Sequence, residues 1–373
     1  MASQIAPPGT SCSASPNGGQ LADLSDLTQL IVAEAPAMDE ARRLPAGLAS
    51  ALVQHGLFRM LVPQSLGGGE RTPAEVLDIV EVLAAEDAST AWCVMVCATT
   101  GMLAAYLEES AAAEIFTADA IVGGVAAPRG TAIEHGGFEI SGRWSWASAS
   151  VVCTWLMGGF RLREDGTHHL AFFPVEQIEL VDDWNPIGLR GTGSGSFEAQ
   201  GVLVPKRRTC AIPAKPRDGS SPVYAFPPAV MTALCIASVG CGLTKAVFDQ
   251  IGGEASDPLL GILAAALARQ MAARALLREQ VEQAWDHALS GDELPRQMIA
   301  HLRLAAVHAA RTAAEECRVL QDSAGGAGVP FSSPLGRRLR DAQTVTAHAL
   351  VSPRLHQELG QLIFGALPGS TQR

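Results

Sequence analysis

The sequence lacks a surplus of positive charge. Its 27 lysines and arginines are outnumbered by 38 aspartates and glutamates, which gives a formal net charge of -11 and a pI near 5.3. A protein that binds nucleic acid neutralises the phosphate backbone with a basic face. The charge balance therefore argues against nucleic acid as a partner.

Long apolar runs and an export signal are also missing. The longest apolar stretches, such as 258–268, are shorter or more interrupted than the ~20 residues that span a bilayer. Residues 1–20 are rich in Ser, Pro and Gly and have no positively charged start followed by an apolar run, so we expect a disordered leader. These features predict a cytoplasmic protein that does not enter a membrane.

Paired cysteines are a third absence. The eight cysteines include no C-x-x-C pair of the kind that binds zinc or exchanges disulfides. Cys93 and Cys97 stand four residues apart on one helical face, but nothing nearby supplies the further ligands that a metal needs. We therefore expect reduced thiols packed in the core and no metal site.

Apolar residues, in contrast, are abundant. Of the 373 residues 48% are hydrophobic and only 17% are charged. This length is enough for two or three domains with large cores. The composition favours internal helical packing or subunit interfaces over a small solvated binding module.

Residues 21–118 are predicted to form an N-terminal helical domain. Leucines recur near the helical period in 21–44, and the pattern continues over 48–55. The tetrapeptide Thr72-Pro73-Ala74-Glu75 is a capping box with proline at the first helical position, which predicts a helix from there to about Ala85.

A further helix is predicted over 88–107. Asp87 and Ser89 are residue types that cap a helix start. The segment is apolar nearly all round, so we expect this helix to be buried.

Residues 119–210 change to short β-type runs separated by glycines, which we assign to a middle β domain. Short strands at this spacing predict a barrel or sandwich. The proline-rich stretch 205–228 is predicted to be a linker, with 211–228 outside the β domain. The predicted strands are 121–126, 131–141 with a turn at Gly136-Gly137, 143–148, 153–161, 168–173 and 195–204.

Helical periodicity returns over 229–373. Four long antiparallel helices predict a C-terminal four-helix bundle. The predicted fold class is therefore α+β multidomain, with helical, β and helical domains in that order. The candidate helices are 229–251, 259–289, 295–323 and 338–364.

Several local motifs follow one another in a recognisable order. They are Leu61-Val62-Pro63 with Gly67-Gly68, Asp87-Ala88-Ser89-Thr90-Ala91-Trp92, Gly142-Arg143-Trp144-Ser145-Trp146-Ala147-Ser148, Gly188-Leu189-Arg190-Gly191-Thr192-Gly193-Ser194, Gly325-Gly326-Ala327-Gly328, Ser333-Pro334-Leu335, Arg337, and Arg340-Asp341 with His348. Together with the domain order they resemble the acyl-CoA dehydrogenase-like superfamily, and most closely its two-component (group D) flavin-dependent monooxygenase branch. The resemblance covers nearly the whole chain from about residue 25 and implies a homotetramer.

The resemblance also implies a set of flavin contacts. Trp146 would cover the flavin ring. Ser148, two residues further and so on the same face of the predicted strand, would donate a hydrogen bond to N5 or O4. Other cofactor contacts would come from backbone amides at Ala126, Ala127 and Gly130, from Gln321, Gly325 and Gly326 toward the phosphate or adenine end on a neighbouring subunit, and from Arg340.

The same resemblance places Trp92, Cys97 and His348 in the substrate pocket. Some members of the branch carry a histidine near the position of Cys97, and their Ser-Gly pair is Ser148-Ala149 here. Structural alternatives remain for these residues: a tryptophan and a serine in a β core, a helix-ending glycine turn, and a histidine satisfied inside the bundle.

The carboxylate base of an acyl-CoA dehydrogenase is missing from its usual positions. No carboxylate follows Arg340-Asp341 until Glu358, and 229–248 contains none. His348 lies in this neighbourhood instead. The resemblance implies that it acts as a base toward the substrate or stabilises the flavin C4a-hydroperoxide, and an ordinary histidine pKa near 6.5 suits either task.

We therefore predict a monooxygenase that uses reduced FAD or FMN and O2 to hydroxylate or N-oxidise a small organic substrate, aromatic or biosynthetic. His348 and Ser148 are the predicted catalytic residues. No nicotinamide-binding motif is visible, so a separate NAD(P)H:flavin reductase is expected. Two alternatives stay open: an atypical FAD-dependent acyl-thioester dehydrogenase with a carboxylate from Glu254 or Glu358, and a flavin-free scaffold of the same fold.

Overall fold

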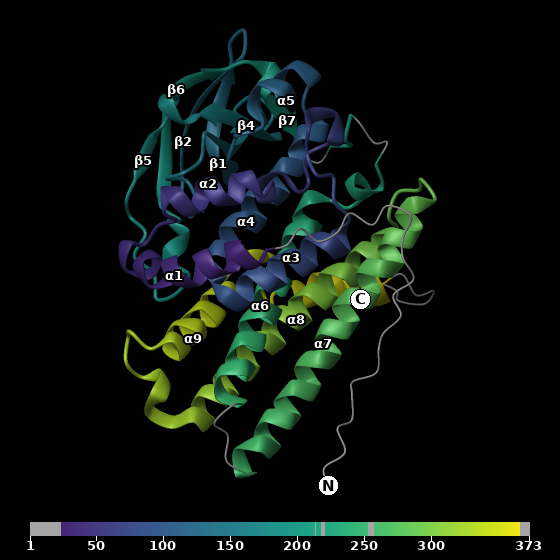
Figure 1. Cartoon of the computed structure of the whole chain (residues 1–373). Helices are drawn as coiled ribbons and strands as arrows, with labels where there is room; N and C mark the ends of the chain where they lie inside the picture. Colours follow the sequence, from purple (N-terminus) through teal and green to yellow (C-terminus); the bar gives the residue numbers. More distant parts are fainter. Residues whose placement is uncertain (1–23, 213, 218–220, 253–256, 366–373) are drawn as a thin grey trace.

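The computed structural model describes residues 24–212, 214–217, 221–252 and 257–365. The predicted leader and Cys12 lie outside these residues. The strands gather at one end of the molecule, the long C-terminal helices at the other, and the first helices lie between them (Figure 1). The predicted order of a helical, a strand-rich and a second helical part is confirmed.

Five helices form the N-terminal part, including the short helix α5, which the sequence patterns did not predict. The predicted capping box is present: Thr72 Oγ1 accepts from Glu75 N–H at 3.3 Å, and Glu75 Oε2 accepts from Thr72 N–H at 2.9 Å. Asp87 caps α4 by accepting from Thr90 N–H at 2.7 Å, whereas Ser89 is buried inside that helix. The helices are α1 (Ser25–Ala41), α2 (Ala46–Gln54), α3 (Pro73–Glu86), α4 (Ala88–Gly101) and α5 (Glu109–Ile115).

The middle part is one seven-stranded sheet with the order β5-β6-β2-β1-β3-β4-β7. Among the described strands, β1 and β3 alone pair in parallel. The edge strand β7 lies inside the proline-rich stretch predicted to be a linker. It is a strand because Cys210 pairs with Leu170 of β4. The strands are β1 (Val122–Glu134), β2 (Phe138–Trp144), β3 (Trp155–Leu162), β4 (His168–Pro174), β5 (Glu179–Val181), β6 (Ser196–Val204) and β7 (Thr209–Ala211).

The sheet curls around an aromatic core. Trp144 stacks on Phe197 at 4.8 Å between ring centroids, and Phe173 of β4 reaches Phe197 of β6 at 6.4 Å although the two strands are not neighbours. Gly130 makes room for this core, since a Cβ there would lie 2.5 Å from the Trp144 ring. The predicted barrel or sandwich is thus a single curled sheet with β5 and β7 at its edges.

Helices α6, α7 and α8 form the long part of the C-terminal bundle. Their bounds are Pro228–Gly252, Asp257–Leu289 and Arg296–Ala324. Helix α6 is almost fully buried and packs against α3 as well as α8. The approach to α3 is close, because a Cβ at Gly242 would lie 2.3 Å from the Glu81 carbonyl oxygen. The bundle and the N-terminal helices therefore share a core.

The fourth predicted helix, 338–364, is wrong as a single element. It is divided into α9 (Pro334–Val345) and α10 (Leu355–Phe364), with a short 3-10 turn, η9 (Ala349–Val351), between them. Pro353 disfavours helical backbone at Ser352, which is extended with ψ 138°. His348 lies in this break rather than inside a helix.

Among the described residues, three helical segments are long and apolar enough to span a membrane by length and composition alone: Ala88–Tyr106, Pro228–Gly252 and Leu259–Leu289. The expectation that no stretch reaches this length is therefore wrong, because alanine, glycine and threonine extend the apolar windows beyond the short leucine runs. The first two windows are 94% and 89% buried inside the protein, whereas the third is only 17% buried. Helix α7 runs along the outer edge of the bundle (Figure 1).

Candidate active site

Three predicted site residues from the three parts of the chain meet in the structure. Trp92 of α4 donates its Nε1–H to Ser148 Oγ at 3.0 Å. The same indole meets His348 edge-on, with 5.8 Å between ring centroids. Trp92 and Ser148 are buried, and His348 is half-buried. Trp92 thus connects a histidine before η9 with a serine in the loop after β2.

The segment that carries Trp146 and Ser148 is a loop, so the prediction of a strand over 143–148 is wrong beyond Trp144, where β2 ends. Two non-glycine residues, Trp146 (φ 69°) and Ala149 (φ 61°), take left-handed backbone that interrupts the strand. Trp146 and Ser148 consequently do not share a strand face. The Trp146 side chain is 71% exposed, whereas that of Ser148 is buried at 5%.

This loop is pinned to the segment before β6. Ala147 N–H donates to the Gly195 carbonyl at 2.9 Å, and Ala149 N–H donates to the Thr192 carbonyl at 2.8 Å. An exposed tryptophan held in strained backbone suggests a functional constraint. The alternative of a core tryptophan applies to Trp144, not to Trp146.

Buried hydroxyls extend inward from Ser148. Ser148 Oγ lies 2.7 Å from Ser194 Oγ, which lies 2.7 Å from Thr192 Oγ1. Thr192 Oγ1 donates to the Leu189 carbonyl at 2.7 Å. The motif at 188–194 did not indicate that its hydroxyls bond to Ser148. Ser194 and Ser148 are 46 residues apart in the chain, so only the fold brings them together.

The far end of these hydroxyls is fixed by helix α9. Asp341 Oδ1 accepts from Leu189 N–H at 2.6 Å, and Leu189 has a left-handed φ of 52°. Gly188 allows the contact, since a Cβ there would lie 2.2 Å from the Arg340 carbonyl oxygen. Burial, followed by the charge of Asp87, raises the pKa of Asp341 to about 7. The two motifs are therefore packed directly against each other.

His348 has a defined hydrogen-bonding state. Its Nδ1 accepts from Leu350 N–H at 3.2 Å and so caps η9. Desolvation lowers the pKa of His348 to about 4, so the ring is neutral near pH 7. A neutral imidazole that accepts at Nδ1 carries its hydrogen at Nε2. His348 is thus a hydrogen-bond donor at Nε2.

Cys97 lies in the core beneath the site. A Cβ at Gly123 would lie 3.0 Å from Cys153 Sγ and 3.7 Å from Cys97 Sγ, so both thiols pack under β1. A hydrogen bond with Cys153, followed by burial, raises the pKa of Cys97, and burial raises that of Cys93. All seven cysteines of the described residues are free and buried. These are packing thiols rather than nucleophiles.

The predicted pyrimidine contacts lie on strand β1. Its pairing with β3 shifts register between Val125 and Pro128, which leaves Ala126 and Ala127 in an exposed bulge. Ala126 O accepts from His168 Nε2 at 3.0 Å. Gly130 has a structural reason of its own, since it packs beneath the Trp144 ring.

The remaining predicted cofactor residues lie around α9 and the turn before it, η8 (Gly325–Gly328). The Arg340 guanidinium stacks on Phe331 at 4.2 Å and donates to its carbonyl at 3.0 Å. Gly325 and Gly326 are exposed, and a Cβ at Gly328 would touch the Gln321 side chain at 3.5 Å. Within the described residues, no hydrogen bond or ring contact joins this group to Trp92, Ser148 or His348.

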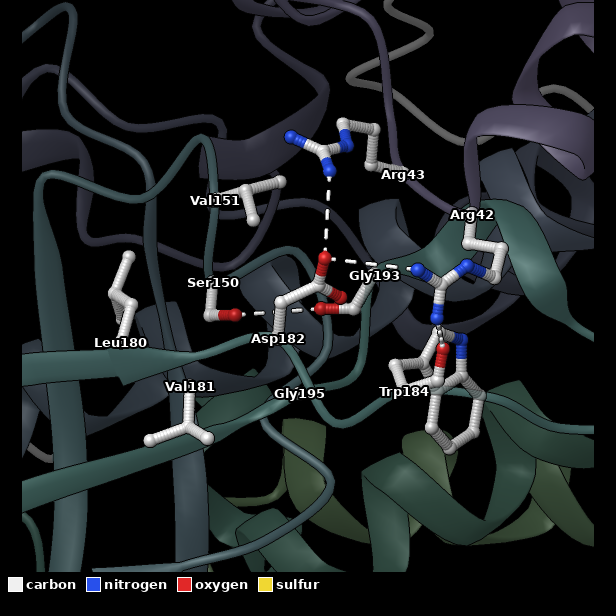
Figure 2. A pocket seen from close by; sticks show the side chains of 10 residues that line it. All are labelled: Arg42, Arg43, Ser150, Val151, Leu180, Val181, Asp182, Trp184, Gly193 and Gly195. Atoms are coloured by element: carbon white, nitrogen blue, oxygen red, sulfur yellow. Dashed lines mark hydrogen bonds and ion pairs between the residues drawn. The ribbon is translucent and has the colours of Figure 1, made fainter.

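A cavity of about 160 Å³ opens beside the pinned loop (Figure 2). Arg42 and Arg43 both reach the Asp182 carboxylate at 3.6 Å, and Ser150 Oγ donates to the Gly193 carbonyl at 3.3 Å. Asp182 therefore offsets one of the two arginine charges. The cavity lining includes none of Trp92, Trp146, Ser148 and His348, so it is separate from the candidate site. No group of three or more His, Cys, Asp or Glu residues in the described ranges could hold a metal ion.

Comparison with known proteins agrees with this geometry. Residues 27–115 match the family "Acyl-CoA dehydrogenase, N-terminal domain" and residues 255–353 match "Acyl-CoA dehydrogenase, C-terminal domain". The indole-3-acetate monooxygenase of Pseudomonas putida is 33% identical over 88% of this chain and 90% of that protein. The chain belongs to the acyl-CoA dehydrogenase-like superfamily.

Two further similarities assign it to a branch of that superfamily. The FADH(2)-dependent resorcinol hydroxylase, oxygenase component, of Rhizobium sp. (strain MTP-10005) is 29% identical over 94% of both chains. The crystal structure of the HsaA monooxygenase from Mycobacterium tuberculosis has a TM-score of 0.87 and 26% identity, covering 94% of this chain and 98% of that one. The superfamily member described here is the oxygenase component of a two-component flavin-dependent monooxygenase. It uses reduced flavin. An oxygenase component of this kind implies a separate flavin reductase.

An acyl-thioester dehydrogenase would need a carboxylate base, and Glu358, the candidate within the described residues, is not placed to act as one. Glu358 lies on α10 and pairs with Arg303 of α8 at 2.7 Å, with 55% of its side chain exposed. It is not beside Trp92 or Ser148. Glu254 lies outside the described residues.

The residues present fit a flavin ring. An exposed tryptophan in strained backbone can cover such a ring, and a buried serine hydroxyl two residues away can make its polar contact. An exposed bulge on β1 brings backbone near the surface for its pyrimidine edge. When bound, reduced flavin supplies two electrons to O2, so that one oxygen atom enters the substrate and the other leaves as water.

Proposed function

We propose that this monooxygenase hydroxylates a small aromatic compound at a site formed by Trp146, Ser148, Trp92 and His348. The convergence of Trp92, Ser148 and His348 from three parts of the chain carries the proposal, because it places an imidazole and a hydroxyl in contact with the same indole. The substrates in the relatives' names, indole-3-acetate and resorcinol, support an aromatic class.

Each residue has a task that follows from its environment. Trp146 covers the flavin ring, since its indole is exposed beside the Ser148 loop. Ser148 contacts the polar edge of the ring. His348 donates from Nε2 toward the reacting oxygen or the substrate, because its Nδ1 is occupied and its pKa is lowered to about 4. Of the two roles that the sequence left open, this state favours the donor over the base.

The exposed bulge at Ala126 and Ala127 offers backbone amides to the pyrimidine edge. Gln321, Gly325, Gly326 and Arg340 serve the phosphate end of a flavin that a neighbouring subunit holds. We propose a homotetramer for this reason. A cytoplasmic location is part of the same proposal.

Helix α7 supports self-association, since one self-complementary stripe would join two copies within such a tetramer. One face packs on α8 through buried residues such as Ala266 and Leu277. A second apolar stripe runs at heptad spacing through Leu260, Leu267 and Met271, which are 48%, 44% and 61% exposed. An uncovered apolar stripe of this kind marks a subunit interface, and a second copy of α7 is its self-complementary partner.

The test is turnover with isotope-labelled O2. The purified full-length chain is mixed with an NAD(P)H:flavin reductase, FAD or FMN, and a panel of indole and phenol substrates. We expect one labelled oxygen atom in each product molecule, and none when the chain is omitted. Absence of labelled product across the panel, together with bleaching of bound flavin by an acyl thioester, would favour the dehydrogenase alternative. Failure to bind flavin in either redox state would favour a scaffold.

A further inference from the structure

Consecutive hydrogen bonds fix the direction of the Ser148 hydroxyl. A carbonyl can only accept, so Thr192 Oγ1 gives its single hydrogen to Leu189 O at 2.7 Å. Thr192 Oγ1 therefore accepts from Ser194 Oγ at 2.7 Å. Ser194 has no second hydrogen and accepts from Ser148 Oγ, also at 2.7 Å. The hydrogen of Ser148 thus points inward, toward Ser194.

The other partner of Ser148 leaves it one free lone pair. The indole Nε1 of Trp92 is a donor only, and it uses one lone pair of Ser148 Oγ at 3.0 Å. Ser148, Ser194 and Thr192 are 5%, 4% and 0% exposed, so bulk water does not compete for these bonds. What Ser148 offers a ligand is an acceptor and not a donor.

The backbone around these hydroxyls is held at both ends. Leu189 N–H donates to the buried Asp341 carboxylate, and the Thr192 carbonyl accepts from Ala149 N–H, one residue after Ser148. The hydroxyls therefore cannot slide past one another without breaking bonds to α9 or to the Ser148 loop. Their direction is a property of the fold rather than of one rotamer.

An acceptor at this position distinguishes two states of a flavin. N5 carries a hydrogen in reduced flavin and a bare lone pair in oxidised flavin, while O4 accepts in both. We propose that Thr192 and Ser194 are positioning residues, which hold Ser148 as an acceptor and make the site prefer reduced over oxidised flavin. The proposal rests on the proposed placement of the flavin ring at Ser148, and it replaces the expectation that Ser148 donates to N5 or O4.

A matched pair of variants at Thr192 tests the direction of the hydroxyls. Thr192→Val keeps the shape but removes the acceptor of Ser194, which is then free to donate to Ser148 and turn the Ser148 hydrogen outward. Thr192→Ser keeps the hydroxyl. The readout is the ratio of the dissociation constants for oxidised and photoreduced FMN or FAD, measured anaerobically on the full-length chain. We expect the preference for reduced flavin to fall about 3- to 10-fold in Thr192→Val and to persist in Thr192→Ser.

Two further variants make the outcome decisive. Ser194→Ala also frees the Ser148 hydrogen, so it should lower the same ratio if Thr192→Val folds poorly. Trp92→Phe removes a donor without reversing the hydroxyls, so the preference for reduced flavin should not fall. The midpoint potential of bound flavin should fall with the ratio, because weaker relative binding of the reduced form lowers it.

The inference is overturned if Thr192→Val and Ser194→Ala bind oxidised and reduced flavin equally more weakly, or if their affinities do not change. Both variants must have the wild-type melting temperature for this comparison. Failure of the proposed site has a different signature. Ser148→Ala would then leave the affinities for both flavin states unchanged.

Discussion

His348 illustrates how neighbours decide what a single residue can do. An isolated histidine has a pKa near 6.5 and serves equally as acid or base. Here the Leu350 N–H occupies Nδ1 at 3.2 Å and desolvation lowers the pKa to about 4. Both effects favour the neutral ring with its hydrogen at Nε2, so the residue acts by donating a hydrogen bond.

This state predicts how two His348 variants differ. His348→Ala removes the donor and should lower product formed per flavin oxidised on the order of 10²-fold. His348→Gln keeps an N–H donor near the position of Nε2 and should retain much more. Because a lowered pKa leaves the ring unprotonated above about pH 4, wild type and His348→Gln should have kcat/KM profiles of the same shape from pH 6 to 8. A wild-type inflection near pH 6.5 that both variants lack would contradict the donor role.

The sequence indicated which candidate residues lie near one another, but not their local geometry. Trp92 and His348, which the resemblance placed in one pocket, are in contact, and Ser148 joins them through Trp92. The face of Ser148 relative to Trp146 could not be predicted, since a run of Trp and Ser fits a strand and nothing in it signals left-handed backbone at a tryptophan. The donor direction of Ser148 depends on hydroxyls remote in sequence.

At the level of elements, the contact between α9 and the segment before β6 sets the site. Asp341 is buried, and its pKa is raised to about 7 by desolvation and then by Asp87. A carboxyl with a raised folded-state pKa stabilises the protein fully below its unfolded value of 3.8, and the contribution is lost as pH rises through about 7. The free energy of unfolding should therefore fall between about pH 4 and pH 7.5.

The variant Asp341→Asn separates this charge from the hydrogen bond. Its amide oxygen still accepts from Leu189 N–H, but no buried charge forms. Relative to wild type, we expect the variant to gain roughly 2–4 kcal/mol of unfolding free energy between pH 5 and pH 8.5. Urea denaturation at several pH values measures this difference. Parallel pH slopes for both proteins would show that Asp341 does not titrate in this range.

Elements with strong local signals were predicted, and those decided by tertiary contacts were not. The capping box of α3 and the three long bundle helices follow from local chemistry and periodicity. The break between α9 and α10 was missed because the apolar spacing continues across it, although Pro353 was a usable signal. Strand β7 was missed because three residues become a strand only by pairing with β4.

At the scale of the whole molecule, α7 presents an apolar stripe on the outside of the bundle. The helix is tied to α3 on its inner side, where Arg278 pairs with Asp78 and Glu81 at 2.8 Å. Its outer side presents Leu260, Leu267 and Met271 to solvent. An arrangement of this kind holds the helix firmly while leaving an apolar stripe for another subunit.

A charge on this stripe should divide the assembly. In the double variant Leu267→Glu/Met271→Glu, two apolar side chains that each contribute about 1.5–3 kcal/mol when buried are replaced by carboxylates, so the dissociation constant between subunits should rise at least about 10²-fold. Val32→Glu is the matched control, because Val32 is 52% exposed on α1 and far along the chain from α7. Light scattering after size exclusion, without detergent, should give a tetramer mass for wild type and Val32→Glu and a smaller mass for the double variant.

If Gln321, Gly325 and Gly326 serve a neighbour's flavin, the smaller species should also bind reduced flavin more weakly. A wild-type monomer, or a tetramer that the double variant leaves intact, would show that the stripe has another purpose.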